Sequence, residues 1–218
     1  MSEGIHITGW TRIAGNTIVI NDKKQAGEEN FPNFAAFIKA FYKKEQLSYP
    51  KFYKMDNLSK LGFLSAELLI KNSDVLKRYG SGEIGVVLAN SSSSLDTDLD
   101  YQELIKDKSN YFPSPSVFVY TLPNIMIGEI CIRHKINGEN AFFICEEFDL
   151  GLIRNYVNHL FKQGRVNACI CGWIELLREQ YHSFMLLVER MPGTLPDDMN
   201  DHGIFSIENL DKIYNIKV

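Results

Sequence analysis

The sequence predicts an α/β protein in which helices cover a mixed, mostly parallel sheet. Three observations lead to this class. Apolar runs of strand length alternate with segments whose apolar residues recur every three or four positions. The run 84–89 is continuously hydrophobic, which is typical of a strand buried on both faces of a parallel sheet. No stretch of linker composition divides the 218 residues, so a single domain over 1–218 is expected.

The first part of the chain predicts strands followed by two helices. Loosely alternating β-branched residues favour strands, and apolar residues at helical spacing favour helices. The longer helix begins at a good N-cap, either Asp56 or Asn57. In order, we expect one or two strands over 5–20 with a turn at 15–16, a surface loop over 22–30, and helices over 34–41 and 56–71.

The rest of the chain repeats the alternation of strands and helices. Acidic residues at the start of one predicted helix suit the positive end of the helix dipole, and Pro123 is expected to kink or restart another. Gly164 is a suitable residue to end a helix. In order, we expect buried strands over 84–89, 141–145, 166–173 and 184–188, helices over 96–106, 117–134 and 150–164, loops over 90–94 and 192–201, and a short terminal element over 204–218.

Composition argues against several classes of function. Lys and Arg total 23 against 27 Asp and Glu, and this net charge of −4 disfavours a general nucleic-acid binder or an anionic membrane surface as partner. Four cysteines are too few for a disulfide scaffold. The first residues do not resemble a signal peptide, and the apolar run 184–188 is too short to cross a bilayer. We expect a soluble, cytoplasmic protein with reduced thiols.

Several motif-like stretches are interpreted as structural. The G-x-G-x-x-G spelling at 80–85 precedes a strand, whereas a dinucleotide site needs it to open a helix. The aspartates of 96–100 lack the glycine and glutamate that a calcium loop needs further along. Cys169 and Cys171 face one side of a predicted strand and are interpreted as core. The histidines show no metal-ligand spacing, so neither a metal nor a cofactor is expected.

Cys145 is the residue best suited to nucleophilic catalysis. It ends a predicted strand just before a predicted helix, where a thiol can have a lowered pKa. However, Glu146, Glu147 and Asp149 follow it, and three carboxylates favour the neutral thiol and raise its pKa. A reactive Cys145 is therefore the less favoured interpretation.

Short motifs along the chain follow one another in the order of a known family. They are Ile7-Thr8-Gly9, Lys54-Met55-Asp56, Thr121-Leu122-Pro123-Asn124, Gly128-Glu129-Ile130, Gly138-Glu139-Asn140, Gly164 with 167–175, and 186–190. In this order they resemble the N-terminal half of a β-ketoacyl synthase, and the segments between residues 114 and 175 carry most of the likeness. The resemblance implies half of a thiolase-like fold.

The resemblance places Glu147 at the position of the family's nucleophilic cysteine. Gap-free counting forward from Gly138 and back from Gly164 reaches Glu147 both times, while Cys145 lies two residues earlier. A carboxylate does not readily form a stable acyl intermediate. Ketosynthases are also longer, because their fold has two similar halves, and the resemblance implies that the half carrying the decarboxylating histidines and lysine is absent here.

The resemblance therefore implies a non-catalytic subunit, similar to the chain-length-factor-like subunits of aryl-polyene and flexirubin-type pigment clusters. Such a subunit pairs with an active, full-length β-ketoacyl synthase in fatty-acid, polyketide or aryl-polyene biosynthesis and helps to set chain length. Acyl carrier protein is a further expected partner, and the assembly is a dimer. The residues expected at the interface or tunnel wall are Phe118, Thr121, Leu122, Asn124 and Glu147. The aromatic-rich stretches 31–41 and 111–120 are further candidates for contacts, or are core.

Two other hypotheses stay open. Cys145 could serve an acyltransferase or thioesterase, with His134 or His159 as its base. The chain could instead be a stand-alone binding or scaffold protein. It would then be a homodimer in which the strand 166–173 or the strand 141–145 pairs across a two-fold axis.

Overall fold

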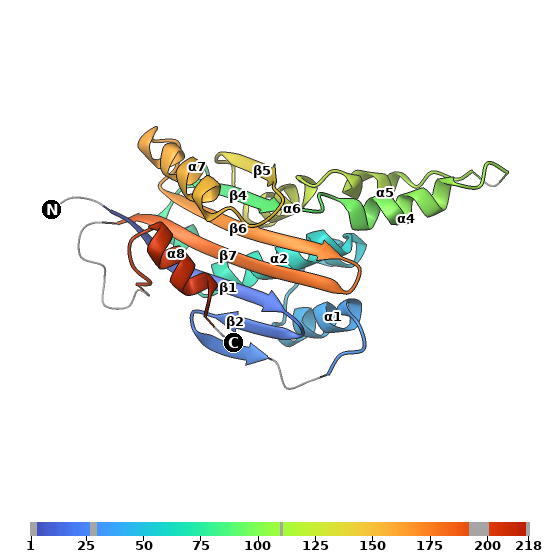
Figure 1. The fold of residues 1–218 in the computed structure, drawn as a ribbon, viewed down its shortest axis with the longest axis horizontal. Helices are drawn as coiled ribbons and strands as arrows, with labels where there is room; N and C mark the ends of the chain where they lie inside the picture. The colour runs from blue at the N-terminus through green and yellow to red at the C-terminus, as the bar shows by residue number, and fades with distance from the viewer. Residues whose placement is uncertain (1–3, 27–29, 110, 192–200, 217–218) are drawn as a thin grey trace.

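A seven-stranded sheet runs through the molecule, and helices lie on both of its faces (Figure 1). This computed structural model describes residues 4–26, 30–109, 111–191 and 201–216. In chain order its elements are β1 (Gly4–Ala14), β2 (Thr17–Ile20), β3 (Lys23–Ala26), α1 (Phe34–Lys44), η1 (Pro50–Lys54), α2 (Asn57–Lys71), α3 (Val75–Arg78), β4 (Ile84–Asn90), α4 (Leu95–Ile105), α5 (Pro115–Phe118), η2 (Val119–Thr121), α6 (Ile125–His134), β5 (Asn140–Ile144), α7 (Leu150–Lys162), β6 (Ala168–Leu177), β7 (Gln180–Met191) and α8 (Ile207–Tyr214).

The strands follow the order β3-β2-β1-β7-β6-β4-β5. Strand β4 pairs in parallel with both β5 and β6, whereas the other four pairings are antiparallel. The α/β class and the mixed sheet are confirmed, but the sheet is less parallel than predicted. The reason is that β1–β2–β3 and β6–β7 are joined by tight turns, and only antiparallel neighbours can be joined in this way.

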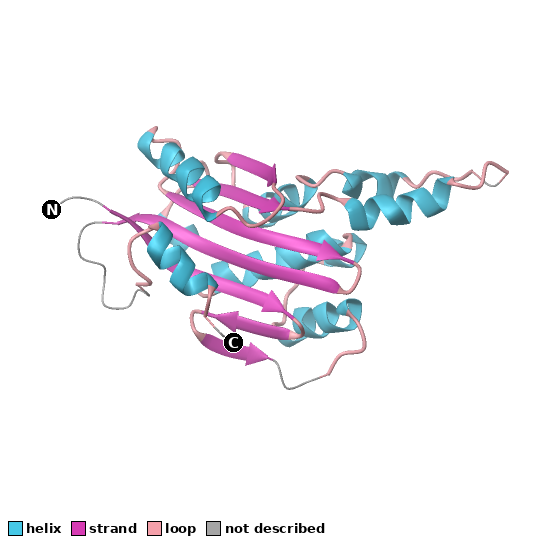
Figure 2. Cartoon of the chain, viewed as in Figure 1, coloured by secondary structure: helices cyan, strands magenta, loops and turns pink. Residues whose placement is uncertain are grey.

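Two hydrophobic cores lie on opposite faces of the sheet. On one face, α1, α2 and α6 pack against Ile84, Val86 and Leu88 of β4. On the other face, α7 and α8 contribute to the core that contains Val87 and Ala89 of the same strand, and both helices lie in front of the sheet in Figure 2. The prediction that β4 is buried on both faces is therefore confirmed.

Several predicted elements differ in detail. The predicted loop over 22–30 contains β3, because Asn21 and Asp22 adopt the positive φ of a tight hairpin turn and place the following polar residues on a sheet edge. Strand β5 is not buried as predicted: it ends the sheet, and Ile144 is 58% exposed. Most of the predicted loop over 192–201 lies outside the described residues.

Pro123 interrupts the long helical pattern as predicted. Residues Pro115–Thr121 and Ile125–His134 form two helical segments that meet at 100°. Within the described ranges no single helix has the length and apolar composition needed to span a membrane, and only this bent pair meets that test jointly.

A buried ion pair ties a short helix to the middle of the sheet. Glu189 of β7 is completely buried, and Arg78 of α3 donates to both of its carboxylate oxygens, at 2.7 and 3.0 Å. The Thr8 hydroxyl of β1 donates to the same carboxylate. These donors compensate for the loss of water around a charge that the surrounding side chains could not otherwise stabilise.

Replacing Arg78 with Met should lower the free energy of unfolding by about 3 kcal/mol, because Glu189 would remain buried without its cationic partner. Urea denaturation followed by circular dichroism measures this change. The neighbouring Lys77→Met variant is the control, since Lys77 is 83% exposed and pairs with an exposed carboxylate. Equal stability of the two variants would contradict the role given to Arg78.

Candidate functional site

The carboxyl ends of the parallel strands meet at one edge of the sheet, which is where open α/β sheets usually carry their sites. Asn90 ends β4, Cys145 follows β5, and the Cys145 amide donates to the Asn90 carbonyl at 2.9 Å. Glu175 of β6 accepts from the amides of Ser91 and Ser92, at 2.6 and 3.2 Å. These bonds hold the serine-rich loop after β4 against the neighbouring strand, and they lower the pKa of Glu175 against the effect of its burial.

Cys145 is not placed as an activated thiol. Helix α7 begins only at Leu150, and Asp149 caps it by accepting from the Leu152 amide at 2.8 Å. The thiol therefore lies five residues before the helix and not at its N-terminus, which corrects the sequence-based expectation. Burial raises the pKa of Cys145, and the Asp149 carboxylate raises it further, as the acidic flanking residues predicted.

The histidines proposed as a base for Cys145 are not placed beside it. His134 lies 3.2 Å from the Glu67 carboxylate, and its helix α6 covers the opposite face of the sheet from Cys145. His159 lies in the last turn of α7, whereas Cys145 precedes the first turn. Neither imidazole is therefore available to remove the thiol proton.

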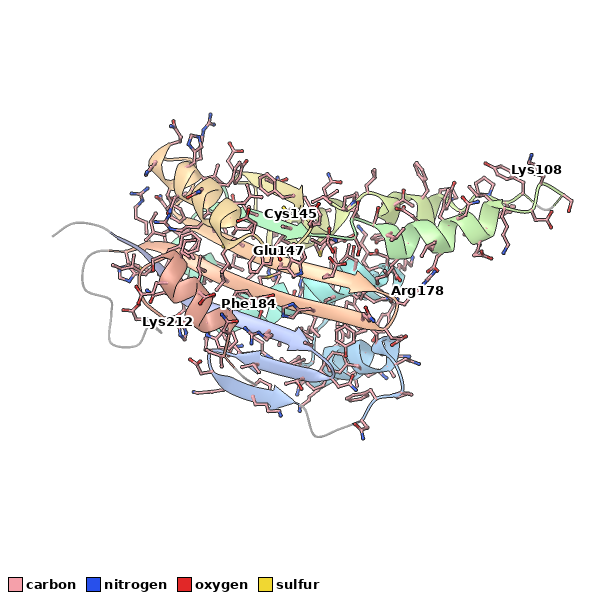
Figure 3. The ribbon with its side chains drawn as sticks, viewed as in Figure 1. Lys108, Cys145, Glu147, Arg178, Phe184 and Lys212 are labelled. Carbon is pink, nitrogen blue, oxygen red and sulfur yellow. The ribbon has the colours of Figure 1, made fainter. Side chains whose placement is uncertain are left out.

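Glu147 lies in the turn between β5 and α7, with its side chain exposed to solvent. Figure 3 shows it with Cys145 beside the start of α7. The adjacent Phe148 anchors this turn by packing on Trp173 and Tyr214, with ring centroids 5.6 and 5.3 Å away. Glu147 also contributes to raising the pKa of Tyr214, after the larger effect of burial. A solvent-exposed carboxylate at this position is not set up for nucleophilic attack.

Residues 95–109 and 111–122, which we call the arm, extend beyond the carboxyl ends of β4 and β5 (Figures 1 and 3). The arm contains α4, α5 and η2, with Lys108 close to its tip in Figure 3. Eight large apolar side chains on the arm are between 41% and 79% exposed, and such a concentration typically marks an interaction surface. They are Leu95, Leu99, Leu104, Tyr111, Phe112, Phe118, Val119 and Leu122.

Most of the residues predicted at an interface lie at the base of the arm. Phe118 is 53% exposed and Leu122 51% exposed. Asn124, just beyond the arm, is also exposed. Thr121 is half-buried, and its hydroxyl donates to the Phe118 carbonyl at 2.7 Å. Glu147 lies apart from them along the chain, on the turn after β5.

The two aromatic-rich stretches noted in the sequence differ in exposure, although Tyr120 at the end of the second is core. In the first, Phe34, Phe37 and Phe41 of α1 are buried core. In the second, Tyr111 and Phe112 are among the most exposed aromatic side chains of the arm, at 59% and 79%. Sequence analysis did not identify Leu95 and Leu99, although their spacing of four residues on an acidic helix was a usable signal.

Polar contacts fix the base of the arm to the body of the molecule. Asp96 of α4 is buried and accepts from the Arg178 amide in the β6–β7 turn at 2.8 Å. The Arg178 guanidinium also donates to Asp100 at 2.6 Å. The Thr97 hydroxyl donates to Asp56 at 2.7 Å, which offsets the effect of burial in raising the pKa of Asp56. The direction of the arm is thus set by buried polar groups.

Replacing Asp96 with Ala should loosen the base of the arm, because the Arg178 amide would lose its buried acceptor. We expect amide hydrogen exchange in α4 to become roughly tenfold faster while exchange in β6 stays unchanged. Hydrogen exchange with mass spectrometry measures this, and Glu103→Ala, at an exposed position of the same helix, is the control. Unchanged exchange in α4 would show that other contacts hold the arm.

Cys145 should react with iodoacetamide no faster than free cysteine at pH 7.5. Because the pKa of Cys145 is raised, a smaller fraction of this thiol than of free cysteine is ionised at pH 7.5, and the thiolate is the nucleophile. Peptide mass spectrometry of a time course measures the rate, and N-acetylcysteine under the same conditions is the reference. A rate well above the reference would overturn this assignment and favour a catalytic thiol.

Comparisons with known proteins identify the fold. No model of a protein family and no curated protein matches the sequence. Among solved structures, the ishigamide ketosynthase/chain length factor has a TM-score of 0.65 at 18% identity, over 88% of this chain and 63% of that chain. A type II polyketide acyl-carrier protein–ketosynthase complex has a TM-score of 0.62 at 13% identity, over 92% and 66%.

A third similar structure is a ketosynthase in complex with its chain length factor from Xenorhabdus doucetiae. Its TM-score is 0.56 at 13% identity, over 87% of this chain and 80% of that chain. The chain therefore has a ketosynthase-like, thiolase-type fold, and it spans less than two thirds of the length of the first two similar chains.

Proposed function

We propose that this chain is a non-catalytic, chain-length-factor-like subunit that pairs with a full-length β-ketoacyl synthase in fatty-acid, polyketide or aryl-polyene biosynthesis. The exposed apolar arm carries the proposal. Its side chains lie on a fixed support and have no covering layer among the described residues, which suits a surface that a partner protein buries. Similar structures include a ketosynthase with its chain length factor, which supports this kind of partner.

The chemistry at the strand ends supports a non-catalytic role. Cys145 has a raised pKa, neither His134 nor His159 lies beside it, and Glu147 is an exposed carboxylate. An acyl-transferring thiol needs a lowered pKa or a base within hydrogen-bond reach. The Cys145 acyltransferase or thioesterase hypothesis therefore has no supporting observation. Acyl carrier protein remains a proposed transient partner, by analogy with the complex that contains one.

We also propose that residues 1–218 form one ketosynthase N-terminal-like domain. Helix α8 supports this proposal because it covers the sheet face that α7 leaves open, with Leu210 and Ile213 in that core. Arg12 of β1 fastens it by donating to the carbonyls of Ile213 and Ile216, at 2.9 and 2.7 Å. The central strands β4, β6 and β7 are thereby covered on both faces by the chain itself.

A homodimeric scaffold is the second candidate function, and the free edge of β5 favours it. Within the described residues β5 pairs only with β4, so its other edge has unpaired backbone groups that a second strand could use. The alternative in which the strand 166–173 pairs across a two-fold axis is wrong, because β6 lies between β4 and β7 and both of its edges are occupied.

Co-expression with ketosynthases encoded in the same genome should recover one of them in stoichiometric amount with this chain. The Leu122→Asp variant should reduce that recovery at least about tenfold, because burying a charge in an apolar interface is unfavourable. Affinity purification with light scattering measures recovery and mass. Leu76→Asp, at a similarly exposed leucine of α3, is the control, and Glu147→Ala should leave recovery intact.

Each result separates the hypotheses. A stable homodimer that captures no ketosynthase would contradict the subunit proposal and support the scaffold. Turnover of an acyl thioester by the purified chain, abolished in Glu147→Ala or Cys145→Ala, would contradict the assignment of a non-catalytic role. Equal loss of recovery in Leu76→Asp and Leu122→Asp would show that the arm is not the surface involved.

A further inference from the structure

A cavity of about 400 Å³ lies where the arm joins the body of the molecule. Lys54, Met55 and Lys60, from η1 and the start of α2, line one side, and Leu104 and Val117 of the arm line the other. This volume lies in the range of small-molecule sites. The cavity is separate from Cys145 and Glu147, which line a different hollow between β5 and α7.

The carboxylates around this cavity already have donors. Asp96 accepts from the Arg178 amide at 2.8 Å, and Asp100 accepts from the Arg178 guanidinium at 2.6 Å. Asp56 accepts from the Thr97 hydroxyl at 2.7 Å and also caps α2. These acidic groups are therefore committed to holding the arm and do not need a ligand.

The two lysines differ from the carboxylates in this respect. Neither the Lys54 nor the Lys60 ammonium makes a hydrogen bond or an ion pair within 4.0 Å in the described part of the chain. Lys60 is half-buried, and burial lowers its pKa although the Asp56 charge opposes the shift. A partly desolvated ammonium without a close acceptor gains free energy when an anion binds beside it.

The rest of the lining mixes the polar residues Asn57, Thr97 and Ser116 with a set of apolar side chains. Met55 is buried, whereas Leu104 is 41% exposed and Val117 is half-buried. An anion without an apolar part would leave these side chains in water. We propose that this cavity binds a small amphipathic anion, with a carboxylate or phosphate head at Lys60 and Lys54 and a short alkyl chain along Leu104 and Val117.

Binding at this place has a mechanical consequence. The head group would contact residues at the start of α2, and the chain would contact residues of the arm. A ligand that touches both walls stabilises their relative position. Occupancy should therefore slow amide hydrogen exchange in α4, and this second readout does not depend on a ketosynthase partner.

Isothermal titration of the purified full-length chain tests the proposal with octanoate, octyl phosphate, 1-octanol and inorganic phosphate. Octanoate or octyl phosphate should bind at least about tenfold more tightly than 1-octanol and inorganic phosphate. The preferred head group distinguishes a fatty-acid type of ligand from a phosphate-bearing one. Lys60→Met should weaken binding about tenfold or more, whereas Lys39→Met, at an exposed position of α1 outside the cavity, should not change it.

Several outcomes would overturn the proposal. They are equal binding of octanoate and 1-octanol, binding of inorganic phosphate as tight as that of octyl phosphate, an unchanged affinity in Lys60→Met, and no saturable binding of either amphipathic anion. If Lys60→Met does not fold, Val117→Asp on the apolar wall replaces it and should abolish binding of the alkyl chain. Because no ketosynthase is present in the titration, these outcomes are independent of whether the chain pairs with one.

Discussion

The position of β4 is the constraint on which the rest of the structure depends. Its two edges bind parallel neighbours, and its side chains enter both cores. The turn before β5 approaches it so closely that a Cβ at Gly138 would lie 2.3 Å from the Ile84 carbonyl oxygen. This contact explains the glycine of the motif Gly138-Glu139-Asn140 in physical terms. This close approach sets where β5 begins beside β4.

Electrostatics decide what the strand ends can do. The family resemblance drew attention to Glu147 and Cys145, and the acidic residues after Cys145 already disfavoured a reactive thiol. The structure adds to this, because burial and Asp149 both disfavour the Cys145 thiolate and α7 starts too late to help. The same carboxylate that caps the helix therefore opposes a nucleophile beside it.

Local pattern predicted most elements, and tertiary contacts account for the rest. The continuous run of β4 and a cap at Asp56 or Asn57 were readable because period and capping are local properties, and the structure places the cap at Asp56. The exposure of β5 was not, since five apolar-rich residues look the same at the centre and at the edge of a sheet. The projection of the arm was also hidden, because whether Phe118 is buried like Phe37 depends on what packs against it.

The arm combines a firmly held base with an uncovered surface, and these two properties support each other. A flexible apolar segment would lose conformational entropy when a partner bound it, and that loss would weaken binding. The buried contacts of Asp96 and Thr97 fix the direction of the arm before any partner arrives. The exposed leucines and aromatic rings are thus already arranged, so that more of the free energy of their burial is available for association.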